Sequence, residues 1–474
     1  MTQRLITMPD LNVIAAVILV IMCTGCGTAV SDKTYSSSSS NIILASNILD
    51  KIENNEDIKY DHVRIIGDLD ISDLKLSLTQ DNKKYINSSI EISRSEIDGL
   101  VKFNDAEFSK YVMFYDTNFL EETEFKDVLF CSNVVFIDSI FEDEVHLDDT
   151  QFLGQSYFDK ATFKGYVSFL NANFYNLTNF RSSQFEKAAG FKDAIFEGGA
   201  YFQKVQFKGD VYFSDSEFKK EVMFTSSEFE DYAEFRDTVF HKNVYFDGTV
   251  FKKNVFFDIY PDPPSRRGTR FEGDLILDDA VIHSMNLNNA EFDGRISLNN
   301  SDFSRLKTDW TALKGPLYYN GPVYLALIKN FKEQEQFEDA DQCYFDYRYQ
   351  SRDGWMDYLS WISCGFGVRP QNTVFLSATL ILIFGIIYWL VGGIERTPVP
   401  GDNEKQKRAG RTRKRSMRDL GVALFFSLLV FTFQARGEWR AVRFYRLVAV
   451  LEGVLGIGLI ALFVVTLANI MIRY

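Results

Sequence analysis

The strongest constraint on the fold is a regular spacing of phenylalanine along the middle of the chain. From Phe103 onward, successive Phe residues lie alternately five and six residues apart, so the pattern repeats every eleven residues. Leu147 is the one exception before the run ends at Phe257. The run explains why the 474-residue chain holds 44 Phe but only 5 Trp. Such a bias indicates an internal repeat.

A second ordered position lies two residues before each Phe, where small or β-branched residues such as Val101, Ala106 and Val112 recur. A helix would place its inward residues three and four apart, whereas this pattern fits short extended segments joined by turns. One coil of such segments cannot bury its own Phe rings, but stacked coils cover one another. Burying each Phe fully contributes on the order of 1.5 to 3 kcal/mol. We therefore predict a β-solenoid.

These repeats resemble the pentapeptide-repeat family, whose unit is a small residue, any residue, a Leu or Phe centre and two polar residues. The resemblance implies a mainly β fold over residues 61–303, namely a right-handed quadrilateral parallel β-helix with one unit per face. The extra residue in alternate units departs from the family's plain unit. With strands about 4.8 Å apart, the rod is expected to be roughly 40 to 50 Å long.

Two interruptions and one change of pattern divide this region. Loops are expected near 77–88, where a polar insert follows an early coil, and near 258–268, where Pro residues remove backbone donors. Residues 304–360 instead show helical spacing and predict a helical hairpin. Its expected task is to cap the open end of the solenoid. A regulatory arm is the alternative.

The N-terminal residues 1–26 have the pattern of an export signal. The apolar stretch from Leu11 to Met22 is too short to span a bilayer and suits the core of a signal peptide. The segment from Cys23 to Cys26 resembles the lipobox of secreted lipoproteins, which implies lipid modification of Cys26. An ordinary signal peptide and an uncleaved anchor are the alternatives. Residues 27–60, which include a Ser-rich run, are expected to form a tether and a capping segment.

The C-terminal residues 361–474 predict an all-α transmembrane module. Residues 373–394 and 447–472 are apolar stretches long enough to cross a membrane. Residues 420–433 form a shorter apolar stretch that suits a re-entrant helix. Glu452 lies within the last stretch, and an intramembrane acid is a candidate functional residue. Alternatively, it pairs with Arg446 or faces the helix bundle.

The order of span, short helix and span resembles the two-span pore module of potassium-channel-like proteins. The segment from Phe426 to Trp439 corresponds to the family's pore helix and selectivity filter. In the filter, Thr432 and Gly437 match the family, whereas four positions differ: Phe433, Gln434, Ala435 and Arg436. Filter carbonyls need backbone dihedrals that Gly permits and Ala resists, and a ring of Arg residues would repel cations. The filter is therefore degenerate, and we expect no potassium selectivity.

The charge distribution predicts the orientation in the membrane. Nine Lys and Arg residues lie between Arg396 and Arg418, and such basic segments stay in the cytoplasm. If the N-terminal signal exports the solenoid, the first span runs from outside to inside and both signals agree. The short helix would then enter from the cytoplasm, which is inverted relative to the channel family. The opposing interpretation places the solenoid in the cytoplasm.

Composition excludes several function classes. A net charge of -14 argues against nucleic-acid binding, and the exposed repeat residues are mixed in sign, as on a solvated surface. The soluble gyrase-inhibiting members of the pentapeptide-repeat family are disfavoured, because they need no membrane module. The few Cys and His residues lack metal-site or triad spacing, so no catalytic, cofactor or metal site is predicted.

The predicted function is a non-enzymatic, membrane-anchored envelope spacer or interaction surface. Its expected partners are membrane lipid, an unidentified protein and further copies of the chain. The alternative is a divergent ion-channel-like pore, which would be a tetramer.

Overall fold

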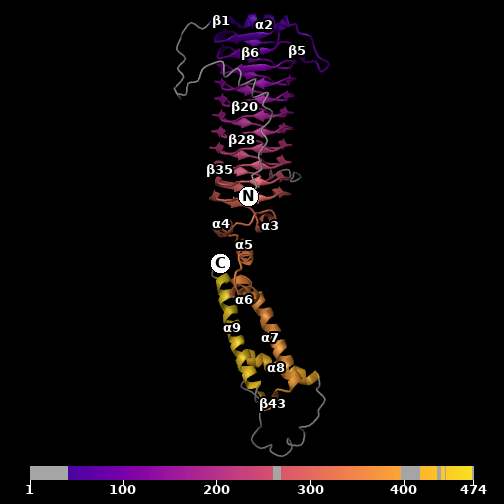
Figure 1. The fold of residues 1–474 in the computed structure, drawn as a ribbon, viewed down its shortest axis with the longest axis vertical. Coiled ribbons are helices and arrows are strands. Elements are labelled where there is room, and N and C mark those ends of the chain that lie inside the picture. Colours follow the sequence, from indigo (N-terminus) through magenta and orange to yellow (C-terminus); the bar gives the residue numbers. More distant parts are fainter. Residues whose placement is uncertain (1–40, 260–267, 397–416, 435–438, 443–444, 472–474) are drawn as a thin grey trace, which may run out of the picture. The chain divides into compact units, whose positions relative to one another are not determined.

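The computed structural model describes residues 41–259, 268–396, 417–434, 439–442 and 445–471. A parallel β-solenoid of about 12 turns comes first and is followed by helices (Figure 1). This confirms the expected solenoid and the change to helical structure after it.

Each coil of the solenoid takes 22 residues. A strand pairs in parallel with the strand four places later, so Val112 lies beside Val134 and Asn118 beside Ile140. One coil comprises β15 (Ile140–Phe141), β16 (Val145–His146), β17 (Gln151–Phe152) and β18 (Ser156–Tyr157). Two eleven-residue repeats therefore make one coil of four short strands. The right-handed quadrilateral cross-section stays a prediction.

Stacked Phe rings fill the interior. The Phe152 and Phe174 rings, one coil apart, have centroids 4.7 Å apart and planes 1° apart. Rings from different strands also meet edge to face, as Phe169 and Phe180 do at 5.6 Å and 87°. Offset stacks and edge-to-face pairs are the favourable arrangements of aromatic rings. Each coil thereby removes the rings of its neighbours from water, as the repeat predicts.

The position two residues before each Phe also faces inward. At several coils this residue is Ser or Thr, and its hydroxyl donates to a buried backbone carbonyl. Ser139 donates to the Phe114 carbonyl at 2.9 Å, and Thr249 donates to that of Phe224 at 2.8 Å. These bonds run between coils and satisfy polar groups that burial would otherwise destabilise.

A left-handed residue recurs every eleven residues, and the sequence analysis missed it. It lies within the five-residue step, for example at Lys160, where φ is 55° and the Ala161 amide donates to the Phe158 carbonyl at 3.1 Å. This is the position of a type II turn that requires positive φ. From 103 to 257 the six-residue steps contain no positive φ, so the left-handed turns belong to the five-residue steps alone. The first such residues are Asp105, Asp116, Asp127, Asp138 and Asp149.

The first coil begins within the residues that we predicted as a tether and capping segment. β1 (Asn41–Leu44) leads into α2 (Ala45–Glu53), whose buried Ala45, Ile48 and Ile52 face the first coil. α2 contacts β2 (Ile58–Asp61) and β4 (Leu69–Asp70). Figure 1 shows α2 at the end of the stack of coils. The helix thus covers the first exposed layer of rings and aliphatic side chains.

The last coil ends at β42 (Leu306–Lys307), where helices begin: α3 (Trp310–Leu313), α4 (Gly321–Glu333), α5 (Phe337–Gln350) and α6 (Trp355–Cys364). The side-chain amide of Asn330 pairs with both backbone groups of Leu306, each at 2.9 Å. Trp310 is fully buried and donates from Nε1 to Asp346 Oδ2 at 2.9 Å. The α4–α5 hairpin therefore satisfies the last strand edge, which would otherwise be free to recruit another strand.

The remaining elements are η1 (Gly365–Gly367), α7 (Pro370–Val391), β43 (Ile394–Arg396), α8 (Met417–Phe431), β44 (Trp439–Ala441) and α9 (Tyr445–Met471). By length and composition α7 and α9 could each cross a membrane, and α8 is a shorter apolar helix. The three helices contact one another (Figure 1).

Candidate functional site

The buried acid Glu452 lies where α7, α8 and α9 meet. Its side chain on α9 is fully buried. Tyr388 of α7 donates from its hydroxyl to Glu452 Oε2 at 2.7 Å, and Ser427 of α8 lies within hydrogen-bond distance of Oε1. One carboxyl group therefore joins three helices that are far apart in the sequence. Arg446, the other partner considered for Glu452, instead donates from Nε to the Ala441 carbonyl at 3.4 Å.

Hydrogen-bond counting favours a neutral Glu452. Ser427 has one hydroxyl proton but two acceptors nearby, Glu452 Oε1 and the Ile381 carbonyl at 2.9 Å. If the acid carries a proton, it can donate to Ser427, which then donates to Ile381, while Tyr388 donates to the acid. Every group then has a partner, and no charge is buried.

Close helix packing fixes this site. An added Cβ on Gly456 of α9 would lie 2.1 Å from the Phe431 carbonyl oxygen of α8, and one on Gly385 of α7 would lie 2.5 Å from a Leu424 methyl group. Only glycine fits at such contacts, which hold α8 against both long helices.

The start of the filter-like segment forms the end of α8. Phe433 has φ 59°, its amide donates to the Val430 carbonyl at 3.0 Å, and the Gln434 amide donates to that of Leu429 at 2.8 Å. This is a Schellman cap, in which the last helix carbonyls are used within the chain. Thr432 likewise donates from Oγ1 to the Leu428 carbonyl at 2.9 Å. Three predicted filter residues lie outside the described residues: Ala435, Arg436 and Gly437.

A two-stranded antiparallel sheet joins the end of α7 to the start of α9. β43 and β44 pair antiparallel, with Glu395 opposite Arg440. The two side chains form an ion pair at 2.7 Å, but both are nearly half exposed, so the pair contributes little stability. The basic residues 397–416, which lie between β43 and α8 in the sequence, are outside the described residues.

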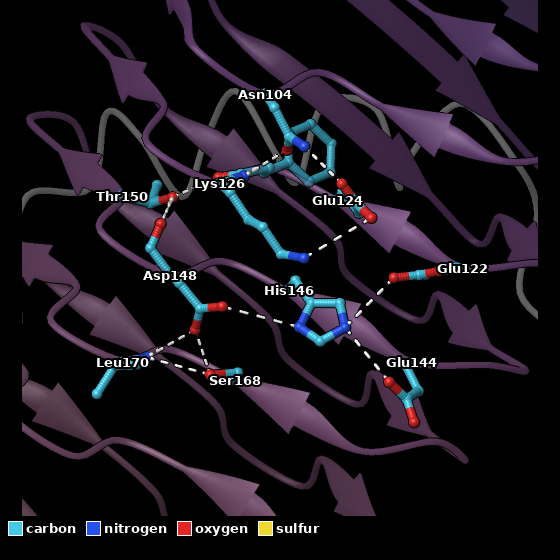
Figure 2. Close-up of polar contacts among 11 residues, drawn as sticks. Asn104, Glu122, Glu124, Lys126, Glu144, His146, Asp148, Thr150, Ser168 and Leu170 are labelled. Carbon is cyan, nitrogen blue, oxygen red and sulfur yellow. Dashed lines mark hydrogen bonds and ion pairs between the residues drawn. The ribbon is translucent and has the colours of Figure 1, made fainter.

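A polar cluster on the solenoid surface surrounds His146 (Figure 2). His146 Nε2 lies 3.3 Å from both Glu122 and Glu144, and Nδ1 lies 3.7 Å from Asp148. Burial raises the pKa of Glu122, and a hydrogen bond with Glu124 raises it further. Within the described part of the chain, no three His, Cys, Asp or Glu side chains have a metal-binding arrangement. The cluster is best explained as packing of charges between coils.

A second imidazole bridges coils farther along the solenoid. His241 lies 2.6 Å from Glu217 through Nε2 and 2.8 Å from Glu272 through Nδ1. Burial lowers the pKa of His241, but the two carboxylates outweigh burial and raise it above its ordinary value of 6.5. The charged form of the ring is therefore favoured between the two acids.

The predicted lipidation residue Cys26 and the apolar signal core lie outside the described residues. Most of the loop expected near 258–268 also lies outside them, because residues 260–267 are not described. Sequence reasoning found Glu452 but missed its partners Tyr388 and Ser427. The only available signal was a Tyr hydroxyl and a Ser hydroxyl in otherwise apolar helices.

Comparison with known proteins gives one positive result. A family model of pentapeptide repeats (9 copies) matches residues 136–184, 169–217 and 180–228. This part of the chain consists of pentapeptide repeats. The pentapeptide repeats coincide with the most regular Phe ladder, including the Phe152, Phe174 and Phe196 stack. No curated protein and no solved structure matches the chain. The resemblance to a channel pore thus rests on the two apolar helices and the short helix between them.

Proposed function

We propose that this protein is a membrane-anchored pentapeptide-repeat spacer whose solenoid stands outside the cell and presents an interaction surface. α7 and α9 anchor it in the membrane, and the basic segment between them remains in the cytoplasm. This orientation agrees with both the export-type N-terminus and the positive-inside rule.

The observation that carries the proposal is the exposure of apolar surface on α7 and α9. Only 17% and 22% of their most apolar stretches are buried within the protein. Large apolar side chains are exposed along both helices, among them Phe375, Leu382, Leu447, Val454 and Val464. Water would disfavour a surface of this extent, whereas lipid chains would cover it.

The solenoid suits a spacer because its strand pairing is continuous. One sheet runs through eleven strands, from β2 to β40 (Ile296–Ser297). Helices cover both ends, through α2 and through the Asn330 contact with Leu306. A capped stack of this kind holds its two ends apart without joining other sheet edges.

The test is release from the membrane. A variant ending at residue 369 lacks α7 to α9, and a second carries Cys26→Ser in addition. We expect the full chain to remain in the membrane fraction after an alkaline wash, and the double variant to become soluble. Release of the full chain by the alkaline wash would contradict anchoring by α7 and α9, and retention of the double variant would indicate an uncleaved N-terminal anchor. Retention of the truncated chain with Cys26 intact would show that lipid also holds the protein.

A divergent pore is the second candidate, and the position of α8 favours it. This 15-residue helix packs against both long helices, as a pore helix would. Against it, four positions of the filter segment differ from those of channels, namely Phe433, Gln434, Ala435 and Arg436. The mass of the detergent-extracted protein distinguishes the candidates, because a four-fold pore requires a tetramer and ion flux after reconstitution.

A further inference from the structure

One face of the solenoid carries a column of outward side chains that is uncharged from Met113 onward, called here the uncharged column. The column follows the sheet that contains β18, β22 (Thr178–Asn179), β26 (Ala200–Tyr201), β30 (Val222–Met223) and β34 (Val244–Tyr245). Each outward residue lies directly beside the next in register. From Met113 onward the residues are Met113, Val135, Tyr157, Asn179, Tyr201, Met223, Tyr245, Ile276 and Ser297. The two positions before Met113 in the same register are Lys59 and Glu91, which form an ion pair with each other at 2.7 Å.

The equivalent columns on the other faces carry charge. They include Glu124 and His146 on one face, Glu217 on another and Glu228 on a third. A charged partner would therefore gain little on the uncharged column, whereas an uncharged partner would not have to desolvate fixed charges there.

Three tyrosines recur on this column at every second coil. Tyr157, Tyr201 and Tyr245 are each half-buried, so part of each ring is open to solvent. With strands about 4.8 Å apart, two coils place equivalent rings about 9.6 Å apart. That distance is close to the length of one disaccharide unit in an extended β-1,4-linked glycan.

The three rings share one orientation. Tyr157 donates from its hydroxyl to Gln155, and Tyr245 accepts from the Asn243 side-chain amide at 3.1 Å. Tyr201 lies over Gly199, where an added Cβ would be 3.2 Å from the Tyr hydroxyl. Each ring thus reaches back over the residue two positions before it. The amides beside the rings supply hydrogen-bond groups that suit sugar hydroxyls.

We propose that this face binds an extended, uncharged β-1,4-linked glycan, with alternate sugar rings stacked on Tyr157, Tyr201 and Tyr245. Aromatic rings give large contact areas at low entropic cost, and their polar tips remain hydrogen-bonded. The inference deepens the proposed function, because a solenoid outside the cell would meet envelope polysaccharides.

The test measures glycan binding by the full-length protein in detergent. The probes are a hexasaccharide and a disaccharide of β-1,4-linked N-acetylglucosamine and a hexasaccharide of α-1,4-linked glucose. We expect the β-linked hexasaccharide to bind at least tenfold more tightly than the other two, because it alone spans three rings at the right spacing. Tyr201→Ala should weaken binding by about fivefold, the triple Ala variant should abolish it, and Tyr201→Phe should retain it.

The controls are Tyr175→Ala and Tyr232→Ala, which remove exposed tyrosines from other columns and should leave binding unchanged. Unchanged thermal unfolding of each variant would show that the coils remain intact. The proposal is overturned if the β-linked hexasaccharide does not bind, if the α-linked glycan binds equally well, or if the triple variant binds normally. The proposal is also overturned if the triple Ala variant binds the glycan normally but no longer associates with other copies of the chain, because the tyrosines would then form a contact between copies. The side of the membrane on which the solenoid lies is measured by an independent thiol-labelling experiment, described in the Discussion. A negative glycan-binding result would therefore leave the proposed function open to its own test.

Discussion

The buried carboxyl of Asp159 shows how a single residue affects the stability of the solenoid. Asp159 follows the ring position of Phe158 within a five-residue step. Its Oδ1 accepts from the Asn179 side chain at 2.8 Å, but Oδ2 has no hydrogen-bond partner among the described residues. Burial raises the pKa of Asp159 from 3.8 to about 6, although Arg181 opposes the shift. The charged form is therefore disfavoured in the folded protein.

This shift predicts a pH dependence. Between pH 3.8 and about 6 the folded state binds more protons at Asp159 than the unfolded state, so stability falls as the pH rises through this window. Asp159→Asn keeps the bond to Asn179 and removes the charge. We expect it to raise the unfolding free energy at pH 7 by about 1 to 3 kcal/mol and to have little effect below pH 4. Thermal unfolding at both pH values measures this, with Asp231→Asn at a partly exposed position as control. Equal effects of Asp159→Asn at both pH values would refute it.

At the scale of elements, the contact of Glu452 with Tyr388 and Ser427 determines how α8 sits between the long helices. Glu452→Gln can still accept from Tyr388 and donate to Ser427, so the helices should retain their stability. Glu452→Leu leaves both hydroxyls without this partner and should lower the stability by about 1 to 3 kcal/mol. Thermal loss of helical signal in detergent measures the effect, with Thr379→Val on the exposed side of α7 as control. Equal stability of the Gln and Leu variants would contradict the role of the carboxyl.

The elements were largely predictable, because each has a one-dimensional signal. Hydrophobic length predicted the long helices, but α7 ends at Val391 and not at 394, because Gly392, with φ 67°, forms a left-handed cap. Phe spacing likewise predicted the coils and their inward residues. The sequence also contained a signal for the left-handed turns, because Asp recurs two residues after alternate Phe residues. We interpreted these Asp residues as part of a solvated surface and did not predict the turns.

The candidate site was only partly predictable. Glu452 stands out as an acid in an apolar stretch, yet Tyr388 lies 64 residues away and Ser427 lies 25 residues away. Close helix packing at Gly385 and Gly456 brings these three residues together, and their spacing in the sequence does not predict that contact. The hydroxyl bonds of Ser139 and Thr249 to other coils were missed for the same reason.

For the whole molecule, the proposed function requires the solenoid to lie outside the cytoplasmic membrane. Cys131 is an exposed cysteine on the solenoid, while Cys343 and Cys364 are buried. A cysteine introduced as Gly401→Cys would mark the basic segment between the two long helices. A thiol reagent that cannot cross membranes can therefore report on both sides of the bilayer.

The decisive measurement is thiol labelling of cells whose cytoplasmic membrane is intact, with Cys131→Ser as the background control. If the solenoid stands outside the cell, Cys131 reacts in intact cells, whereas Gly401→Cys, in the Cys131→Ser background, reacts only after the membrane is permeabilised. If Cys131 does not react in intact cells while Gly401→Cys does, the solenoid lies in the cytoplasm, and the proposed orientation is contradicted.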